Sequence, residues 1–314
     1  MIVFGPVPSR RLGRSLGINN IPPKHCSYSC LYCQVGPTKA TEIRQRAFYE
    51  PEYLFDEIAK HLEKLKRCGE TVDYLTFVPD GEPTLDAGLG RAIELLRVLD
   101  IKIAVISNAS LISERQVREN LKLADWVSLK VDAVDRAIWQ CINRPHEELD
   151  LELILSGMLT FAGEFTGTLA TETMLLEGIN TGQDSTKRLA SFLLKLAPEI
   201  VYLSIPTRPT ADSNVRAACA ACAETLTRVY QTVNEVMPRV ELLTGYEGNF
   251  FSSTGDFVED ILAITAVHPM RKDAVMKLLE KNHQDWRAVE VLLSQGKLQE
   301  VDYQGYSFYV RSSL

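Results

Sequence analysis

The sequence predicts an α/β fold, a partial (β/α)6 TIM-like barrel followed by a small C-terminal winged-helix domain. Two observations support this prediction. First, six strand-like runs are each followed by a run with apolar residues at helical spacing, and such alternation is typical of a parallel sheet with right-handed crossovers. Second, the alternation ends near Tyr246, and three helical runs then precede two strands joined by the turn Gln304–Gly305. Six units are fewer than the eight that close a complete barrel, so an open barrel is expected.

The barrel strands are expected where apolar and β-branched residues cluster between turn residues. In parallel sheets of this kind the functional side chains lie at the carboxyl ends of the strands. The residues that directly follow each strand are therefore the first candidates for a site. The predicted strands are Ser15–Asn19, Val72–Val78, Ile101–Ile106, Trp126–Val131, Thr168–Leu176 and Ile200–Ile205.

The barrel helices are expected from apolar residues at helical spacing. In Glu52–Lys66, for example, Leu54, Ile58 and other apolar residues recur at that spacing, with Pro51 at the first turn and Gly69 just beyond the end. The other predicted helices are Leu89–Leu99, Glu114–Leu123, Leu151–Phe161, Ser185–Leu196 and Ala217–Val236.

The C-terminal part has the outline of a winged helix. Its predicted elements are the helices Phe257–Val267, Arg271–Lys281 and Asp285–Leu293 and the strands Leu298–Tyr303 and Tyr306–Arg311. A stretch with three glycines and two serines, residues 245–255, is the expected linker. The predicted domains are therefore a barrel over residues 1–244 and a winged-helix-like domain over residues 256–314.

Composition excludes several classes of protein. The chain has 314 residues, 46% of them hydrophobic and 24% charged, which are ordinary values for a globular protein. No apolar run approaches the ~20 residues that span a bilayer, and the first eleven residues lack the apolar core of a signal peptide. The net charge of −7 gives no general attraction for nucleic acid. These features predict a cytoplasmic protein without membrane association, whose seven cysteines are poor candidates for disulfides.

Three of the cysteines, Cys26, Cys30 and Cys33, fall within eight residues with the spacing C-x3-C-x2-C. Soft thiolates on one loop suit an iron–sulfur cluster. A structural zinc site normally uses four ligands, and a ferredoxin-type carrier uses a fourth cysteine. Three protein ligands on a four-iron cluster leave one iron open to bind a further ligand.

This spacing, with Tyr32 directly before the third cysteine, resembles the signature of the radical S-adenosylmethionine (SAM) superfamily. The resemblance implies a [4Fe–4S] cluster held by Cys26, Cys30 and Cys33, with SAM bound through its amino and carboxylate groups to the open iron. It implies an enzyme of oxidoreductase or lyase type, in which the reduced cluster cleaves SAM and the resulting radical abstracts a hydrogen atom from a substrate. A flavodoxin or ferredoxin would supply the electron, and no catalytic side chain is identified.

The resemblance extends to other strand ends. Pro79–Thr84 resembles the G-G-E-P motif of the superfamily, which contacts the SAM amino group, although Asp80 replaces its first glycine. Asn108 lies in the turn after the third strand, and polar residues alternate along the fourth and fifth strands. The resemblance thus implies a cofactor-binding set of Tyr32, Gly81, Glu82, Pro83, Asn108, Ser128, Lys130, Asp132, Glu172 and Met174.

The opening segment Gly5–Gly17 resembles an Fe–S oxidoreductase group of the same superfamily that carries a C-terminal winged helix and is distantly similar to the wyosine-forming tRNA enzymes. Those enzymes carry further cysteines near the N-terminus, whereas this chain has none before Cys26. Candidate cations for an anionic substrate are Arg10, Arg11, Arg14, Arg144 and Arg208.

Two kinds of substrate remain open. The wyosine-like resemblance and the N-terminal arginines favour an RNA base. The acidic balance and a C-terminal part with seven lysines and arginines against eight acids favour a peptide, a protein or a small molecule, and we prefer this second group. A different class of protein, an iron–sulfur electron carrier or sensor with a winged-helix output, is the alternative to an enzyme.

Overall fold

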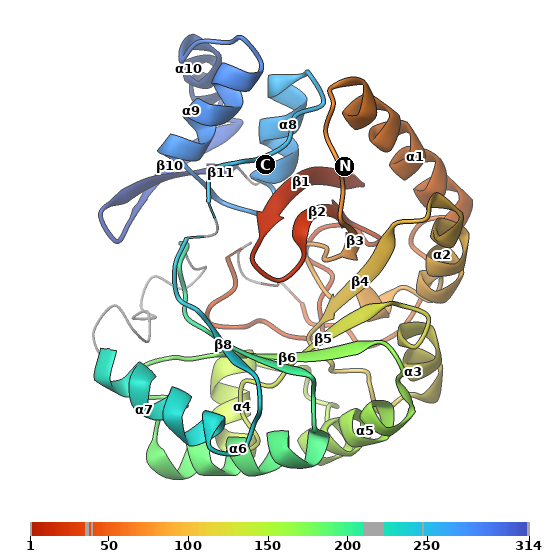
Figure 1. The fold of residues 1–314 in the computed structure, drawn as a ribbon, viewed down its shortest axis with the longest axis vertical. Coiled ribbons are helices and arrows are strands. Elements are labelled where there is room, and N and C mark those ends of the chain that lie inside the picture. The colour runs from red at the N-terminus through yellow and green to blue at the C-terminus, as the bar shows by residue number, and fades with distance from the viewer. Residues whose placement is uncertain (1, 35–37, 39, 210–222, 247, 313–314) are drawn as a thin grey trace.

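The computed structural model contains one eight-stranded sheet in the strand order β1 to β8, with helices on its outside (Figure 1). It describes all residues except 1, 35–37, 39, 210–222, 247 and 313–314. The strands are β1 Val3–Ser9, β2 Gly13–Ile18, β3 Tyr74–Phe77, β4 Lys102–Ser107, β5 Trp126–Lys130, β6 Thr168–Met174, β7 Ile200–Ser204 and β8 Val240–Leu243. The helices around them are α1 Pro51–Arg67, α2 Leu89–Leu96, α3 Arg115–Leu121, α4 Arg136–Asn143, α5 Leu151–Glu164, α6 Gln183–Leu196 and α7 Ala223–Asn234.

Strands β2 to β8 are parallel, and β1 runs antiparallel to β2. Within the described part of the chain β1 and β8 are the two edges of the sheet and do not pair with each other. The sheet is therefore an open, partial TIM-like barrel, which confirms the predicted fold class.

All six predicted barrel strands are present, and three further elements were not predicted. Strand β1 contains Gly5, Pro6 and Pro8, which suggest a loop, yet it pairs with β2 as a hairpin around an irregularity in the register. Strand β8 has only four residues, and α4 lies where the sequence offered no clear helical pattern. The start of the predicted helix Ala217–Val236, with Cys219 and Cys222, lies outside the described residues, and α7 confirms the remainder.

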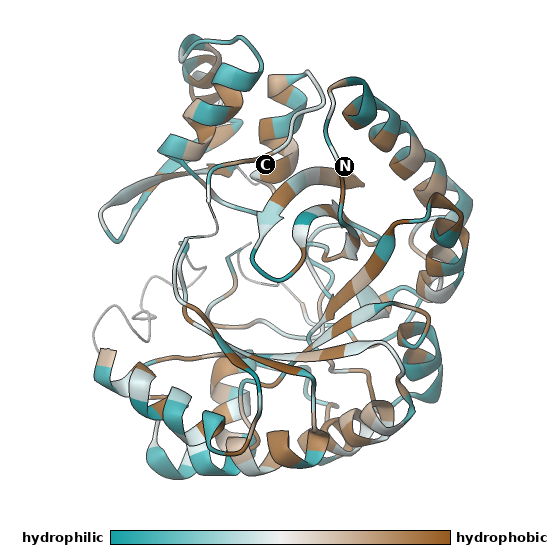
Figure 2. Ribbon diagram, in the orientation of Figure 1, coloured by the Kyte–Doolittle hydropathy of each residue, from teal (hydrophilic) through white to brown (hydrophobic). Residues whose placement is uncertain are grey.

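Hydrophobic residues pack on both sides of the sheet. In Figure 2 strand β4 is mostly hydrophobic, whereas the outer helices alternate between hydrophilic and hydrophobic residues. The main core fills the space between the sheet and these helices. A smaller cluster, with Leu12, Trp126, Tyr202 and Leu243 among its members, packs apart from the main core and draws on β5, β7 and β8.

The C-terminal part forms a small unit of three helices and a three-stranded sheet with its own core. This confirms the predicted helices and hairpin and adds the two-residue strand β9. The elements are α8 Phe257–Ile264, β9 Met270–Arg271, α9 Lys272–Lys281, α10 Arg287–Ser294, β10 Leu298–Tyr303 and β11 Tyr306–Arg311.

This unit is attached to the barrel beside β1 (Figure 1). Phe4 of β1 packs against Ala263 and Val267 at the end of α8. Glu70, in the turn after α1, accepts hydrogen bonds from Ser252 Oγ at 3.0 Å and from the Ser253 backbone N–H at 3.4 Å. Polar and apolar contacts together hold the C-terminal unit against the edge of the sheet.

Candidate active site

A cavity of about 300 Å³ opens at the carboxyl ends of the parallel strands. Its walls include residues that follow β3, β4 and β7, the loop that carries the three cysteines, and the turn between β1 and β2. Val267 of the C-terminal unit also lines it. The cavity is therefore the place where the strand ends predicted to be functional meet.

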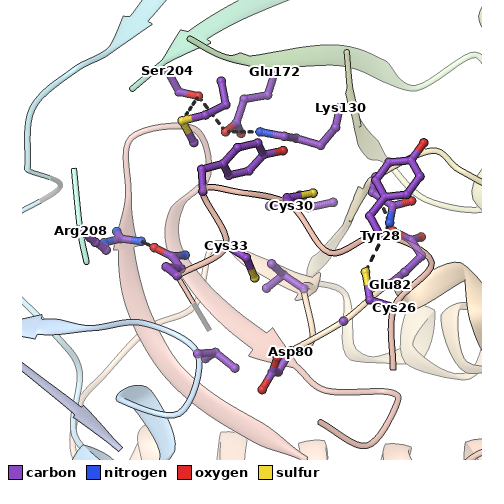
Figure 3. Close-up of a pocket in the computed structure, with 18 of the residues that line it drawn as sticks. Cys26, Tyr28, Cys30, Cys33, Asp80, Glu82, Lys130, Glu172, Ser204 and Arg208 are labelled. Carbon is purple, nitrogen blue, oxygen red and sulfur yellow. Dashed lines mark hydrogen bonds and ion pairs between the residues drawn. The ribbon is translucent and has the colours of Figure 1, made fainter. Parts of the chain in front are cut away.

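Cys26, Cys30 and Cys33 all line this cavity (Figure 3). Their loop is held from two sides by backbone hydrogen bonds. The Ser29 N–H donates to the Asn143 carbonyl at 3.0 Å, at the end of α4, and the Glu82 N–H donates to the His25 carbonyl at 2.9 Å. The loop is thus fixed between α4 and the segment that follows β3.

Gly81 makes the contact with the segment after β3 possible. A Cβ atom at this position would lie 2.0 Å from the His25 carbonyl oxygen, which is far inside van der Waals contact. Only glycine lets the two backbones approach this closely. The replacement of the preceding motif glycine by Asp80 is tolerated, because the Asp80 side chain lines the cavity and lies 3.4 Å from Lys24 Nζ.

Glu82 connects the ends of β3 and β4. Its buried carboxylate accepts hydrogen bonds from the Asn108 N–H at 2.7 Å, from Ser107 Oγ at 2.7 Å and from Thr84 Oγ1 at 2.6 Å. Burial raises the pKa of Glu82, although these donors oppose the increase. Glu82 and Asn108 line the cavity, whereas Pro83 is buried behind it at the start of a short 3-10 turn.

A charge network occupies the wall opposite the cysteine loop. Lys130 of β5 and Glu172 of β6 are register partners, and Lys130 Nζ lies 3.1 Å from Glu172 Oε1 (Figure 3). Arg11 reaches the same carboxylate from the β1–β2 turn, and Ser204 Oγ donates to it at 3.1 Å. Burial alone would raise the pKa of Glu172, but the charges of Lys130 and Arg11 outweigh burial and lower it to about 2.

Asp132 joins this wall to the cysteine loop. Its buried carboxylate accepts hydrogen bonds from the Tyr32 hydroxyl and from the Met174 N–H, the latter at 2.8 Å. Tyr32 and Met174 line the cavity. Ser128 lies two residues before Lys130 on β5 and does not line the cavity. Its Oγ atom is buried without a hydrogen-bond partner among the described residues.

The five predicted arginines separate into two groups. Arg10, Arg11 and Arg208 line the cavity. Arg14 pairs with Asp73 at the opposite end of the strands, and Arg144 is exposed at the end of α4, outside the cavity lining. The structure therefore brings only the first group to the site.

The sequence did not indicate every residue of this site, and Lys24 and Asn143 are two examples. Lys24 lines the cavity from the cysteine loop, and Asn143, the last residue of α4, donates from Nδ2 to Cys30 Sγ at 3.4 Å. The sequence signal for Asn143 is weak, because it directly precedes Arg144 in the segment Asn143–His146 and the arginine is the more prominent candidate there.

The residues present fit an iron–sulfur cluster with an open iron. The three thiols come from one loop and face one cavity, and thiolate is the ligand that such clusters use. Within the described ranges no three His, Cys, Asp or Glu side chains are arranged to hold a single metal ion. Burial raises the pKa of the Cys30 thiol to about 12. Binding of iron by this thiol must therefore release its proton.

An open parallel barrel with such a cysteine loop at its strand ends defines a class of protein. The family model of the Radical SAM superfamily matches residues 20–190, more than half of the chain, so the chain belongs to this superfamily. Enzymes of the superfamily bind a [4Fe–4S] cluster and SAM and need an external reductant, and the predicted cofactors are thereby confirmed.

Over nearly its whole length the chain is similar to a UPF0026 protein of Methanocaldococcus jannaschii, with 45% identity over 99% of this chain and 96% of the relative. A UPF0026 protein of a Synechocystis species is 39% identical over 66% of this chain and 76% of the relative. Among solved structures, a radical SAM methyltransferase from Sphaerobacter thermophilus shares the fold, with a TM-score of 0.58 and 15% identity over 73% of this chain and 66% of that chain.

Among the residues that the structure describes, no helix is both long enough and apolar enough to cross a bilayer.

Proposed function

We propose that this chain is a radical SAM enzyme in which Cys26, Cys30 and Cys33 hold the [4Fe–4S] cluster. The observation that carries the proposal is that these three thiols share one cavity with the polar ends of β4, β5 and β6. When bound, the cluster and SAM together supply a 5′-deoxyadenosyl radical that abstracts a hydrogen atom from the substrate. We further propose an oxidoreductase or lyase outcome in the cytoplasm, with a flavodoxin or ferredoxin as reductant.

The chain's own residues would position the cofactors and exclude water. The segment with Gly81 and Glu82 contacts the cysteine loop and would meet the amino group of SAM, as the G-G-E-P motif does. Lys130, Glu172 and Met174 line the opposite wall and would bind the remainder of SAM. Tyr32, Asn108 and Asp132 would fix the loop and this wall relative to each other. Pro83 and Ser128 do not line the cavity and would support the cofactor-binding residues from behind them.

The substrate would bind at the outer part of the cavity. Among the described residues, five cationic side chains line the cavity against three carboxylates: Arg10, Arg11, Lys24, Lys130 and Arg208 against Asp80, Glu82 and Glu172. This balance favours a substrate with an anionic group, which Arg10, Arg11 and Arg208 would meet. Arg14 and Arg144 would contribute only to a substrate large enough to extend beyond the cavity.

For the C-terminal unit we propose a winged-helix-like domain over residues 256–314, joined by residues 245–255 to a barrel over residues 1–244. Its separate hydrophobic core supports this division. Its balanced charge and the position of Val267 in the cavity wall favour a role in enclosing a peptide, protein or small-molecule substrate over binding RNA. Retention of bulk tRNA on the protein at moderate salt would instead support an RNA substrate.

The test is anaerobic reconstitution of the cluster, followed by SAM and dithionite and detection of 5′-deoxyadenosine by mass spectrometry. Cys30→Ala is expected to abolish the product. Cys68→Ser, at an exposed cysteine remote from the loop in sequence, is the matched control and should leave it unchanged. If the protein with its cluster neither binds nor cleaves SAM, with or without candidate substrates, the role shifts to electron transfer or sensing.

A further inference from the structure

Two asparagine side chains donate hydrogen bonds to two of the three loop cysteines. Asn108 Nδ2 lies 3.5 Å from Cys26 Sγ, and Asn143 Nδ2 lies 3.4 Å from Cys30 Sγ. They come from different elements: Asn108 follows β4, and Asn143 ends α4. Each amide is thus directed at a different sulfur from outside the loop.

The structure holds both amides in place. Asn143 is 2% exposed, and its Nδ2 also donates to Asp132 Oδ2 at 2.7 Å. Its backbone carbonyl accepts the hydrogen bond from Ser29, so Asn143 contacts the cysteine loop through both backbone and side chain. Asn108 Nδ2 also donates to Ser27 Oγ at 2.9 Å. Neither amide can turn away from its sulfur without breaking a second hydrogen bond.

An N–H donor on a cluster sulfur acts differently on the two oxidation states. Reduction adds one negative charge, part of which resides on the sulfurs, so a donor there stabilises the reduced state more than the oxidised state. Hydrogen bonds to the sulfurs are among the factors that set the potential of iron–sulfur clusters. Asn143 is buried, and its low-dielectric surroundings strengthen this electrostatic effect.

We propose that Asn108 and Asn143 are positioning residues that raise the reduction potential of the cluster by donating N–H···S hydrogen bonds to Cys26 and Cys30. The inference rests on the proposed function, because it requires the cluster to bind at these cysteines. It assigns Asn143 a role in how easily the external reductant delivers its electron.

The test is the midpoint potential of the reconstituted cluster, measured without SAM by a redox titration followed by electron paramagnetic resonance. Asn143→Leu removes the donor and keeps the number and branching of the side-chain heavy atoms. The ratio of reduced to oxidised cluster at a fixed potential should fall about tenfold, which is about 59 mV for a one-electron couple. Asn108→Leu should lower the potential in the same direction.

Asn120→Leu is the matched control, because Asn120 is also a largely buried asparagine but lies on α3 and its side chain bonds to Gln116. Its potential should equal that of the wild type. Wild-type potentials in both Asn143→Leu and Asn108→Leu, at full cluster content, would overturn the proposal. If Asn143→Leu holds no cluster, the same criterion is applied to the smaller Asn143→Val.

The two proposals fail in distinguishable ways. A wild-type protein that loads a cluster but never yields 5′-deoxyadenosine would contradict the proposed function, while the potentials of the variants would still test the inference. A cluster that survives the loss of Cys26 or Cys30 would overturn the inference, because the amides would then face no cluster ligand.

Discussion

Replacing Glu172 by glutamine tests the charge network in the cavity wall. The carboxylate is buried between Lys130 and Arg11, whose side chains are 13% and 16% exposed. Glu172→Gln keeps the shape and removes the charge, so two largely buried cations lose their shared counter-ion. Removal of one partner of a buried ion pair typically costs about 3–5 kcal/mol.

The pKa of Glu172 gives a second route to the magnitude. The carboxyl group titrates at about 2 in the folded protein, against an ordinary value of 4.5. At about 1.36 kcal/mol per pKa unit, this difference corresponds to about 3 kcal/mol of stability. Because the folded pKa is the lower one, the contribution is fully present above about pH 5 and is lost as the pH falls toward 2. At pH 3 less than half of it should remain.

The assay is urea unfolding of the cluster-free, reduced protein at pH 7 and pH 3, with circular dichroism as the signal. At pH 7 the free energy of unfolding of Glu172→Gln should lie about 3 kcal/mol below that of the wild type, and at pH 3 the gap should narrow by more than half. Glu241→Gln removes the partner of Arg239, an ion pair in the same sheet that is more exposed than that of Glu172. It should change the free energy of unfolding by less than about 1 kcal/mol. An equal gap at both pH values would refute this account of the network.

Three further predictions concern the surroundings of the cysteine loop. Gly81→Ala should lower the iron content after reconstitution by more than half, measured by iron and sulfide analysis, because its Cβ would displace the His25 carbonyl; normal iron content would show that the loops separate without consequence. Glu82→Gln should cost about 1–3 kcal/mol in urea unfolding, because an amide NH2 would face buried donors; an unchanged midpoint and slope would count against it. Arg14→Ala should leave SAM cleavage unchanged, since Arg14 pairs with Asp73 at the far end of the strands, and a loss of 5′-deoxyadenosine would contradict that placement.

Much of the barrel could be predicted because its parallel strands are buried on both sides. Strand β4 is a nearly continuous apolar run, and the helix that follows it, α3, has its buried residues Val117, Asn120 and Leu121 on one face. Strand β1 could not be predicted, because one glycine and two prolines interrupt its apolar pattern and indicate a loop. It forms a strand by pairing with the neighbouring β2. Helix α4 escaped because its eight residues give too short a pattern to identify on their own.

The candidate site likewise has parts that could be predicted from the sequence and parts that could not. The cysteine spacing and the motif around Glu82 are local in sequence, so both could be recognised before the fold was known. The role of Asn143 depends on a contact with Cys30 across 113 positions of the chain, which no local pattern indicates. Arg11 and Arg14 lie only three positions apart along the β1–β2 hairpin, yet Arg11 lines the cavity and Arg14 pairs with Asp73 at the amino-terminal ends of the strands. The sequence alone does not separate the two.

The contact between the C-terminal unit and the barrel, made by Phe4 and Glu70 on the barrel side, affects one part of the cavity and not another. Val267 brings a separately packed unit to the rim of the cavity, while the cysteines belong wholly to the barrel. Substitutions around Glu70 would affect the attachment of this unit, and with it the position of Val267, without touching the cysteine loop. The shape of the cavity rim at Val267 can therefore change through the C-terminal unit while the cysteine loop stays the same.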